Sequence, residues 1–396
     1  MKSVTFIIKV MNGWGAERVI SILGNHLVQY GYDVTIIITH QPYADAQLEL
    51  INPKIRVIAL ENEISQNNTF IKTLIMQKTR FIGIINRILF RDGDEKYLVE
   101  KYRARNCEKV RYLKKYFSLN NKTVAVAFIN DSIYLTLLSA KKTNRIIISE
   151  RGDPQQCLSS KTNRAFFKVM YPKADEMIFQ SPGAMQWYKQ NTNVTGRVIF
   201  NPIMPNLPKK SSGKRNNCIV NFCRITPQKK LDTLIEAFEI FAESYSDYEL
   251  YIYGNSDPAE PEYIHFIKNK INSVSHKDRI HLVPAQKDIH DKIIDSAMFV
   301  SSSYYEGMSN SMLEAMAIGI PTICTDCPAG GARAVIKDHE NGILLPVNDV
   351  QAMADAMKEI VDNPDLAEKL SLNGKKIRKD LSIDKIVYQW MESIDG

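Results

Sequence analysis

The stretch Ala297-Met-Phe-Val-Ser-Ser-Ser-Tyr-Tyr-Glu-Gly-Met-Ser-Asn-Ser-Met-Leu-Glu-Ala-Met-Ala-Ile-Gly-Ile-Pro-Thr-Ile-Cys-Thr325 predicts a strand, a loop, a helix and a second strand. The apolar run 298–300 is the first strand, the serines at 309 and 311 offer N-caps, and Gly319 with Pro321 ends the helix. In such a unit a ligand lies beyond the carboxyl end of the first strand, where the helix amides and dipole favour an anion such as a phosphate. The stretch therefore predicts a parallel α/β fold with an anion site.

Two carboxylates lie on this predicted site, Glu306 in the loop and Glu314 in the first turns of the helix. A carboxylate is a poor phosphate ligand but a good acceptor for paired sugar hydroxyls. A diphosphate at the helix N-terminus with a sugar on either side would use both acids. The alternative is an ordinary buried helix with two incidental acids.

The pattern Glu306-Gly307-x6-Glu314-Ala315-Met316-Ala317-x-Gly319-x-Pro321 resembles the donor-site signature of the retaining nucleotide-sugar glycosyltransferases of family four. The resemblance implies an α/β protein with two facing Rossmann-like domains (the GT-B fold), a deep cleft between them and a C-terminal helix that crosses back. This chain departs from the family at Met308-Ser309-Asn310, where Phe-Gly-Leu is more usual.

The composition is that of an ordinary globular protein, with 396 residues, 44% hydrophobic and 24% charged. The sequence predicts neither a transmembrane helix nor a signal peptide, and six scattered cysteines do not form a disulfide framework, so we expect a cytoplasmic protein. Cys324 and Cys327 have the spacing of a redox or half-zinc motif, but no second Cys or His pair accompanies them, and we interpret them as structural.

The positive charge is concentrated in residues 70–122, which hold fourteen Lys or Arg and five Asp or Glu. Apolar residues recur at helical spacing over 70–90, which predicts a basic amphipathic helix. Such a surface fits the anionic inner leaflet of a membrane. The alternative is a solvated helical face that packs on its own sheet; nucleic acid is disfavoured because no recognition motif accompanies the charge.

The first βα turn, Gly13-x-Gly15-x-x-Arg18, follows a strand predicted at 4–10. It lacks the third glycine of the dinucleotide fingerprint, and no acid ends the strand predicted at 34–39, which disfavours an NAD enzyme. Strands predicted at 123–129 and 145–149 end in Asn130-Asp131-Ser132 and in Glu150-Arg151-Gly152-Asp153. Many family members have a histidine near position 150, so Glu150, Arg151 and Asp153 are our candidates for acceptor binding, with structural cap and turn residues as the alternative.

A second α/β pattern begins at a strand predicted at 218–222, which ends in Arg224 and is followed by Lys229 and Lys230 at the start of a helix. Cations at a helix start oppose its dipole, so an anion between them is expected. Arg224 and Lys229 match the family's Arg and Lys that neutralise the donor diphosphate, whereas Cys223 and Lys230 stand where the family has glycines.

The expected domains are an N-terminal acceptor domain over 1–203 with the basic insertion 70–122, a linker over 204–216, a donor domain over 217–380 and a returning helix over 381–396. By resemblance, the catalytic residues are Arg224, Lys229 and Glu306, and no metal or other cofactor is needed. The resemblance also implies a set of donor-binding residues. These are Gly13, Gly15, Asn201, Gly254, Gly307, Met308, Ser309, Asn310, Ser311 and Glu314.

The predicted function is retaining transfer of a hexose or N-acetylhexosamine from a nucleotide sugar, with UDP as the expected nucleotide, to a glycan acceptor. The polysaccharide branch of the family suggests a polyprenyl-diphosphate-linked saccharide of capsule or O-antigen synthesis, used at the inner face of the cytoplasmic membrane. The alternatives are a nucleotide-sugar epimerase or phosphorylase of the same fold, and a non-catalytic lipid or polyanion binder.

Overall fold

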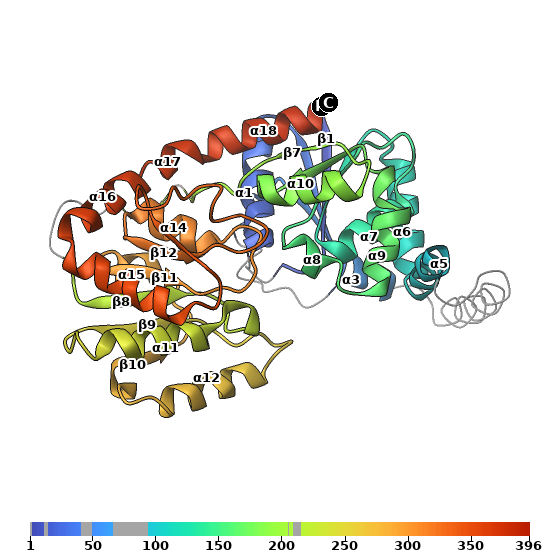
Figure 1. The fold of residues 1–396 in the computed structure, drawn as a ribbon. Helices are drawn as coiled ribbons and strands as arrows, with labels where there is room; N and C mark the ends of the chain where they lie inside the picture. The colour runs from blue at the N-terminus through green and yellow to red at the C-terminus, as the bar shows by residue number, and fades with distance from the viewer. Residues whose placement is uncertain (1, 12–14, 41–49, 66–93, 205, 209–214) are drawn as a thin grey trace. The chain divides into compact units, whose positions relative to one another are not determined.

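A computed structural model describes residues 2–11, 15–40, 50–65, 94–204, 206–208 and 215–396. The chain divides into two compact units (Figure 1). Unit 1 holds residues 1–180, 184–200 and 386–396, and unit 2 holds residues 181–183 and 201–385. The helix expected over 70–90 and most of the expected linker lie outside the described residues.

Unit 1 is built on a sheet of seven strands in the order β3-β2-β1-β4-β5-β6-β7, and all its neighbouring strands pair in parallel. Its central strands are nearly continuous Val and Ile runs that are buried on both faces, as a parallel sheet between helices requires. The strands are β1 Ser3–Ile8, β2 Asp33–Ile38, β3 Arg56–Ala59, β4 Val124–Phe128, β5 Ile146–Ser149, β6 Glu176–Phe179 and β7 Gly196–Val198.

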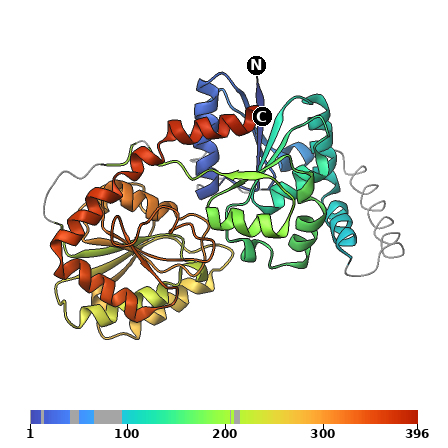
Figure 2. The same cartoon turned by 45° about the horizontal axis from the view of Figure 1, so that its top comes forward.

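Unit 2 has a six-stranded parallel sheet in the order β10-β9-β8-β11-β12-β13, with helices on both faces (Figure 2). The strands are β8 Cys218–Phe222, β9 Glu249–Tyr253, β10 Ile280–Val283, β11 Met298–Ser301, β12 Thr322–Thr325 and β13 Ile343–Leu345. In both units the strand order reverses beside the first strand, which is the doubly wound arrangement. The expected fold class, α/β with two Rossmann-like parallel sheets, is confirmed.

Two helices of unit 1, α5 Glu95–Arg105 and α6 Cys107–Leu119, come directly before β4 in the chain. The other helices of unit 1 are α1 Gly15–Gln29, α3 Leu60–Ser65, α7 Asn130–Ser139, α8 Pro154–Cys157, α9 Lys161–Val169, η1 Tyr171–Lys173 and α10 Pro182–Asn191, whose first two residues group with unit 2. Those of unit 2 are η2 Pro227–Lys229, α11 Leu231–Ala242, α12 Glu262–Asn272, η3 Lys277–Arg279, α13 Ile289–Ile293, α14 Asn310–Ile318, α15 Val350–Asp362, α16 Pro364–Gly374 and α17 Ile377–Asp380.

The last helix, α18 Ile383–Asp395, packs on unit 1 from residue 386 onward. The buried ring of Trp390 stacks on Phe128 at the end of β4, with ring centroids 5.5 Å apart. At the end of the helix, Tyr32 donates a hydrogen bond of 2.8 Å to Asp395, and Arg145 donates one of 3.0 Å to the carbonyl of Ser393. These contacts make the end of the chain part of the core of unit 1.

Candidate functional site

The candidate site lies where the strand order of unit 2 reverses, between β8 and β11. The loops that follow these two strands leave the same edge of the sheet in opposite directions, which is where α/β proteins bind ligands. Arg224 and Lys229 come from the loop after β8, and Glu306 comes from the loop after β11. The topology therefore brings together the three residues that we assigned to catalysis.

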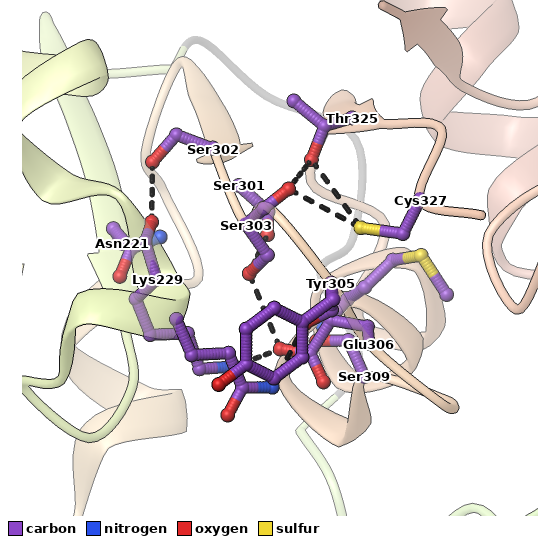
Figure 3. A network of polar contacts seen from close by, with 12 residues as sticks. Asn221, Lys229, Ser301, Ser302, Ser303, Tyr305, Glu306, Ser309, Thr325 and Cys327 are labelled. Atoms are coloured by element: carbon purple, nitrogen blue, oxygen red, sulfur yellow. Dashed lines mark hydrogen bonds and ion pairs between the residues drawn. The ribbon is translucent and has the colours of Figure 1, made fainter. Parts of the chain in front are cut away.

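Lys229 and Glu306 form a direct ion pair across these two loops (Figure 3). Both side chains are mostly buried, with exposed fractions of 13% and 17%, and Ser303 Oγ donates a second hydrogen bond to Glu306 at 3.2 Å. Burial lowers the pKa of Lys229, but the charge of Glu306 and the hydrogen bond to it outweigh burial, so the pKa lies above its ordinary value. Lys229 is therefore a cation at neutral pH, ready to face an anionic ligand.

Hydrogen bonds between the two loops hold this pair in place. Gln228 accepts from the backbone amide of Tyr304 and donates through its side chain to the carbonyl of Tyr305, each at 2.9 Å. Ser302 Oγ donates to the carbonyl of Lys229 at 2.8 Å (Figure 3). These hydrogen bonds hold the backbone around both charged residues.

Lys230, which stands where the family has a glycine, has a left-handed backbone with φ of 48°. Glycine adopts this conformation freely, whereas an L side chain resists it. The loop therefore keeps a glycine-like turn although the sequence departs from the family there, and this turn places Lys229 at the start of α11.

Arg224 makes a 2.7 Å ion pair with Asp257, which lies in the loop after β9. Gly254 directly follows that strand, and a side chain there would approach the carbonyl of Cys223 to 2.0 Å. Only glycine allows the two loops to pass this closely, so Gly254 determines where Arg224 and Asp257 meet. Sequence reasoning missed Asp257, because nothing in its neighbourhood marks it as a partner of a residue 33 positions away.

The N-terminus of α14 is capped by Ser309, whose Oγ accepts from the amide of Met312 at 3.3 Å. The expectation that a serine between 309 and 311 caps this helix is confirmed. Asn201 donates to the side-chain carbonyl of Asn310 at 2.6 Å, which joins two of the predicted donor-binding residues.

Gly307 lies so close to the loop after β12 that a side chain at Gly331 would come within 1.8 Å of its carbonyl.

Glu314, the second acid of the signature, is buried, and its Oε2 lies 2.8 Å from Nε2 of His290 on α13. The His290 ring also stands edge-on to Phe222 at the end of β8, with ring centroids 6.0 Å apart. His290 is a second residue that sequence reasoning missed, since a single histidine in a five-residue helix carries no motif.

The site lies in a part of the chain that matches a known family. Residues 205–377 match the family model described as "Glycosyl transferases group 1". Over these residues the chain is similar to the group 1 glycosyl transferases. Arg224, Lys229, Glu306 and Glu314 all fall within this range, and the recognised resemblance is thereby confirmed.

Several relatives are similar to this chain over different lengths. An "Uncharacterized glycosyltransferase" of Haemophilus influenzae is 26% identical, but the match covers 46% of this chain and 51% of that protein. An uncharacterized glycosyltransferase of Methanocaldococcus jannaschii is 28% identical over 45% of this chain and 49% of its own length. The chain thus spans about half the length of these two relatives. A Campylobacter jejuni GalNAc-alpha-(1->4)-GalNAc-alpha-(1->3)-diNAcBac-PP-undecaprenol alpha-1,4-N-acetyl-D-galactosaminyltransferase is 22% identical over 100% of this chain and 98% of its own.

Two solved structures share the fold over the whole chain. TarM of Staphylococcus aureus has a TM-score of 0.77 at 14% identity and covers 100% of this chain and 99% of its own. HepE of Anabaena, solved in complex with UDP, has the same TM-score and identity and covers 100% of both chains. At this identity the likeness shows the GT-B fold alone.

Three further donor-site candidates lie in different parts of the chain. Met308 is 6% exposed, so its side chain is part of the core rather than an open contact. Gly15 opens α1 at the carboxyl end of β1 in unit 1. Gly13 lies outside the described residues.

The acceptor-site candidates Glu150, Arg151 and Asp153 follow β5 in unit 1, and all three have partners within that unit. Asp153 caps α8, accepting from the amides of Gln155 and Gln156 at 2.9 and 3.3 Å. Arg151 lies over the Phe128 ring, 5.0 Å from its centroid, and burial lowers its pKa to about 9. The cap and turn alternative therefore describes what Asp153 does in the structure.

Glu150 is a buried acid inside unit 1, where Tyr171 donates a hydrogen bond to its Oε1. Burial raises its pKa to about 7, although hydrogen bonds from Tyr171 and Cys157 act in the opposite direction. The carboxyl group therefore titrates close to neutral pH. Its contacts are those of a core residue.

Within the described ranges, no group of three or more His, Cys, Asp and Glu could hold a metal ion. Cys324 and Cys327 are free thiols, and Cys327 donates to the carbonyl of Ser303 at 3.2 Å. Burial raises the pKa of Cys327 to about 12, so the thiol stays protonated. Cys327 thus helps to hold the loop that carries Glu306 (Figure 3).

Proposed function

We propose that this protein is a glycosyltransferase that retains anomeric configuration and moves a hexose or N-acetylhexosamine from a UDP-sugar to a glycan acceptor. The observation that carries the proposal is the Lys229–Glu306 pair at the switch point of unit 2, with Arg224 on the same loop. This arrangement offers cations for a diphosphate beside an acceptor for sugar hydroxyls.

In the proposed reaction the bond between the anomeric carbon and the donor β-phosphate oxygen breaks, and a bond to an acceptor oxygen forms. The acceptor hydroxyl gives its proton to the departing β-phosphate oxygen, and the nucleoside diphosphate leaves. Arg224, Lys229 and the amides at the start of α14 stabilise the negative charge that grows on the leaving diphosphate. Positioned cations of this kind do the work that a metal ion does in other transferases.

The two acids have separate roles in this proposal. Glu306 accepts hydrogen bonds from hydroxyls of the donor sugar, and Glu314 accepts them from the ribose. Donor binding then requires an exchange of partners, because Lys229 and Glu306 are paired with each other in the structure. The diphosphate takes over Lys229, and Glu306 turns to the sugar.

We propose a polyprenyl-diphosphate-linked saccharide as the acceptor, in the synthesis of a capsule or O-antigen at the inner face of the cytoplasmic membrane. The support is the similarity to the Campylobacter jejuni transferase, whose name specifies a PP-undecaprenol-linked substrate. None of the described helices is long and apolar enough to cross a membrane.

Membrane contact would use the basic surface of α5 and α6. Residues 94–122 hold nine Lys or Arg and four Asp or Glu. The apolar side of α6, with Val110, Leu113 and Phe117, is buried in the core of unit 1. For the described part of the basic insertion, attraction to anionic lipid is therefore electrostatic rather than by insertion of an apolar face.

The test is a transfer assay with UDP-sugars and a short polyprenyl-diphosphate-linked acceptor, followed by NMR of the product. A new linkage with the donor's anomeric configuration, formed at an unchanged rate in EDTA, supports the proposal. Consumption of donor without acceptor indicates the epimerase alternative. An inverted linkage contradicts retention, and lipid binding without nucleotide binding indicates the non-catalytic alternative.

A further inference from the structure

We propose that His290 is a positioning residue that fixes the Glu314 carboxylate for the ribose of the nucleotide. This inference rests on the proposed function, because it takes Glu314 as the ribose acceptor. It goes further by naming a residue outside the matched signature on which ribose recognition depends.

The first step is the burial of Glu314. Its side chain is 6% exposed, in the second turn of α14. A carboxylate removed from water needs hydrogen-bond donors to remain ionised and in one orientation. One such donor comes from another element, the short helix α13.

His290 is that donor. An ionised carboxylate can only accept, so the 2.8 Å contact requires a proton on Nε2 of His290. A histidine that donates one ring N–H to a carboxylate is a common way to fix the orientation of both groups.

The position of His290 is itself fixed from two sides. Its neighbours on α13, Ile289 and Ile293, are buried and anchor the short helix on unit 2. Its ring meets the edge of Phe222 at an interplanar angle of 90°. Because Phe222 ends β8 at the switch point, the His290–Glu314 pair lies at the same sheet edge as Lys229 and Glu306.

A purely structural role for the pair predicts a different result from a ribose-positioning role. If His290 only stabilises α13, its loss affects all nucleotides equally. If it orients the carboxylate that binds the ribose, its loss affects only nucleotides that have ribose hydroxyls.

The test is calorimetric titration of the full chain with UDP and with 2′,3′-dideoxy-UDP. His290→Leu is expected to weaken UDP binding about tenfold, the scale of one hydrogen bond to a charged group, and to leave dideoxy-UDP binding unchanged. His290→Gln keeps an N–H donor and is expected to bind UDP within about threefold of wild type. In a Glu314→Gln background, His290→Leu should have no further effect on UDP binding.

The matched control is His276→Ala, which removes a histidine–carboxylate pair elsewhere in unit 2. His276 lies 3.0 Å from Glu239 of α11, and neither residue belongs to α13 or α14. Its loss should leave both affinities unchanged, which separates a local effect at Glu314 from a general loss of stability.

Two results overturn the inference. In one, His290→Leu binds UDP as wild type does; in the other, it loses UDP and dideoxy-UDP in the same proportion. If His290→Leu does not fold, His290→Gln is compared with Glu314→Gln. Equal losses of UDP affinity in these two variants contradict the expectation that the glutamine N–H replaces the histidine donor. A wild-type protein that binds no nucleoside diphosphate and transfers no sugar overturns the proposed function as well.

Discussion

Replacing Glu306 with glutamine should change UDP binding and sugar transfer in opposite directions. The substitution keeps the shape of the side chain and its contact with Ser303 but removes the charge that faces Lys229. Because UDP and Glu306 compete for Lys229 in our account, Glu306→Gln should bind UDP more tightly than wild type. Transfer should fall, because glutamine is a weaker acceptor for the hydroxyls of the donor sugar.

The magnitude follows from the burial of the pair. Exposed ion pairs contribute up to about 1 kcal/mol, and breaking a buried pair costs about 3–5 kcal/mol. With side chains 13% and 17% exposed, an intermediate loss of about 2 kcal/mol in the free energy of unfolding is expected. A phosphate that restores a negative charge beside Lys229 should recover about 1–2 kcal/mol, or about five- to thirtyfold in Kd.

The assay is calorimetric titration with UDP, combined with thermal unfolding in the presence and absence of UDP. The matched control is Glu236→Gln, which removes a Lys–Glu pair with Lys270 between α11 and α12. The control should leave the UDP affinity unchanged. Equal or weaker UDP binding by Glu306→Gln would refute the exchange of partners at Lys229.

Three further predictions concern stability and membrane binding. Because the pKa of Glu150 is raised to about 7, the stability that its protonated form contributes is complete below its unfolded-state pKa and is lost as pH rises through about 7. The free energy of unfolding of wild type should therefore fall by about 3 kcal/mol relative to Glu150→Gln between pH 4 and pH 8, measured by urea unfolding. A difference that does not depend on pH contradicts this prediction. Lys230→Gly should raise the free energy of unfolding by up to about 1 kcal/mol, because glycine relieves the left-handed backbone; a loss of stability in thermal unfolding contradicts the strain. The double variant Lys114→Glu, Lys115→Glu reverses two exposed charges on α6 and should weaken flotation with anionic liposomes at low salt. The binding free energy should fall by about 1 kcal/mol or more per residue. Unchanged flotation contradicts a role of this surface in membrane binding.

The sequence predicted the parts of the fold that depend on local pattern. The strand predicted at 218–222 has the bounds of β8, and the strand predicted at 145–149 differs from β5 by one residue, because each is a short apolar run bounded by polar residues. The cap of α14 was predictable for the same reason, since Ser309 acts within its own turn. The order of the strands then brings the predicted residues Lys229 and Glu306 together.

Contacts between distant segments could not be predicted in this way. Asp257 and His290 reach Arg224 and Glu314 only because β9 and α13 pack beside β8 and β11, and neither residue has a motif around it. Glu150 is polar and follows a strand, which favoured a ligand contact, yet it lies in the core beside Tyr171. Whether such an acid faces a ligand or the core depends on tertiary packing.

The central claim is that Arg224 and Lys229 stabilise the leaving diphosphate. Its most direct test is the initial rate of sugar transfer by Arg224→Ala and Lys229→Ala, measured with saturating donor and acceptor on folded protein. The account predicts a rate about 100-fold or more below wild type for each variant, the scale of losing one charge-stabilising group. Transfer within about threefold of wild type by either variant would contradict it.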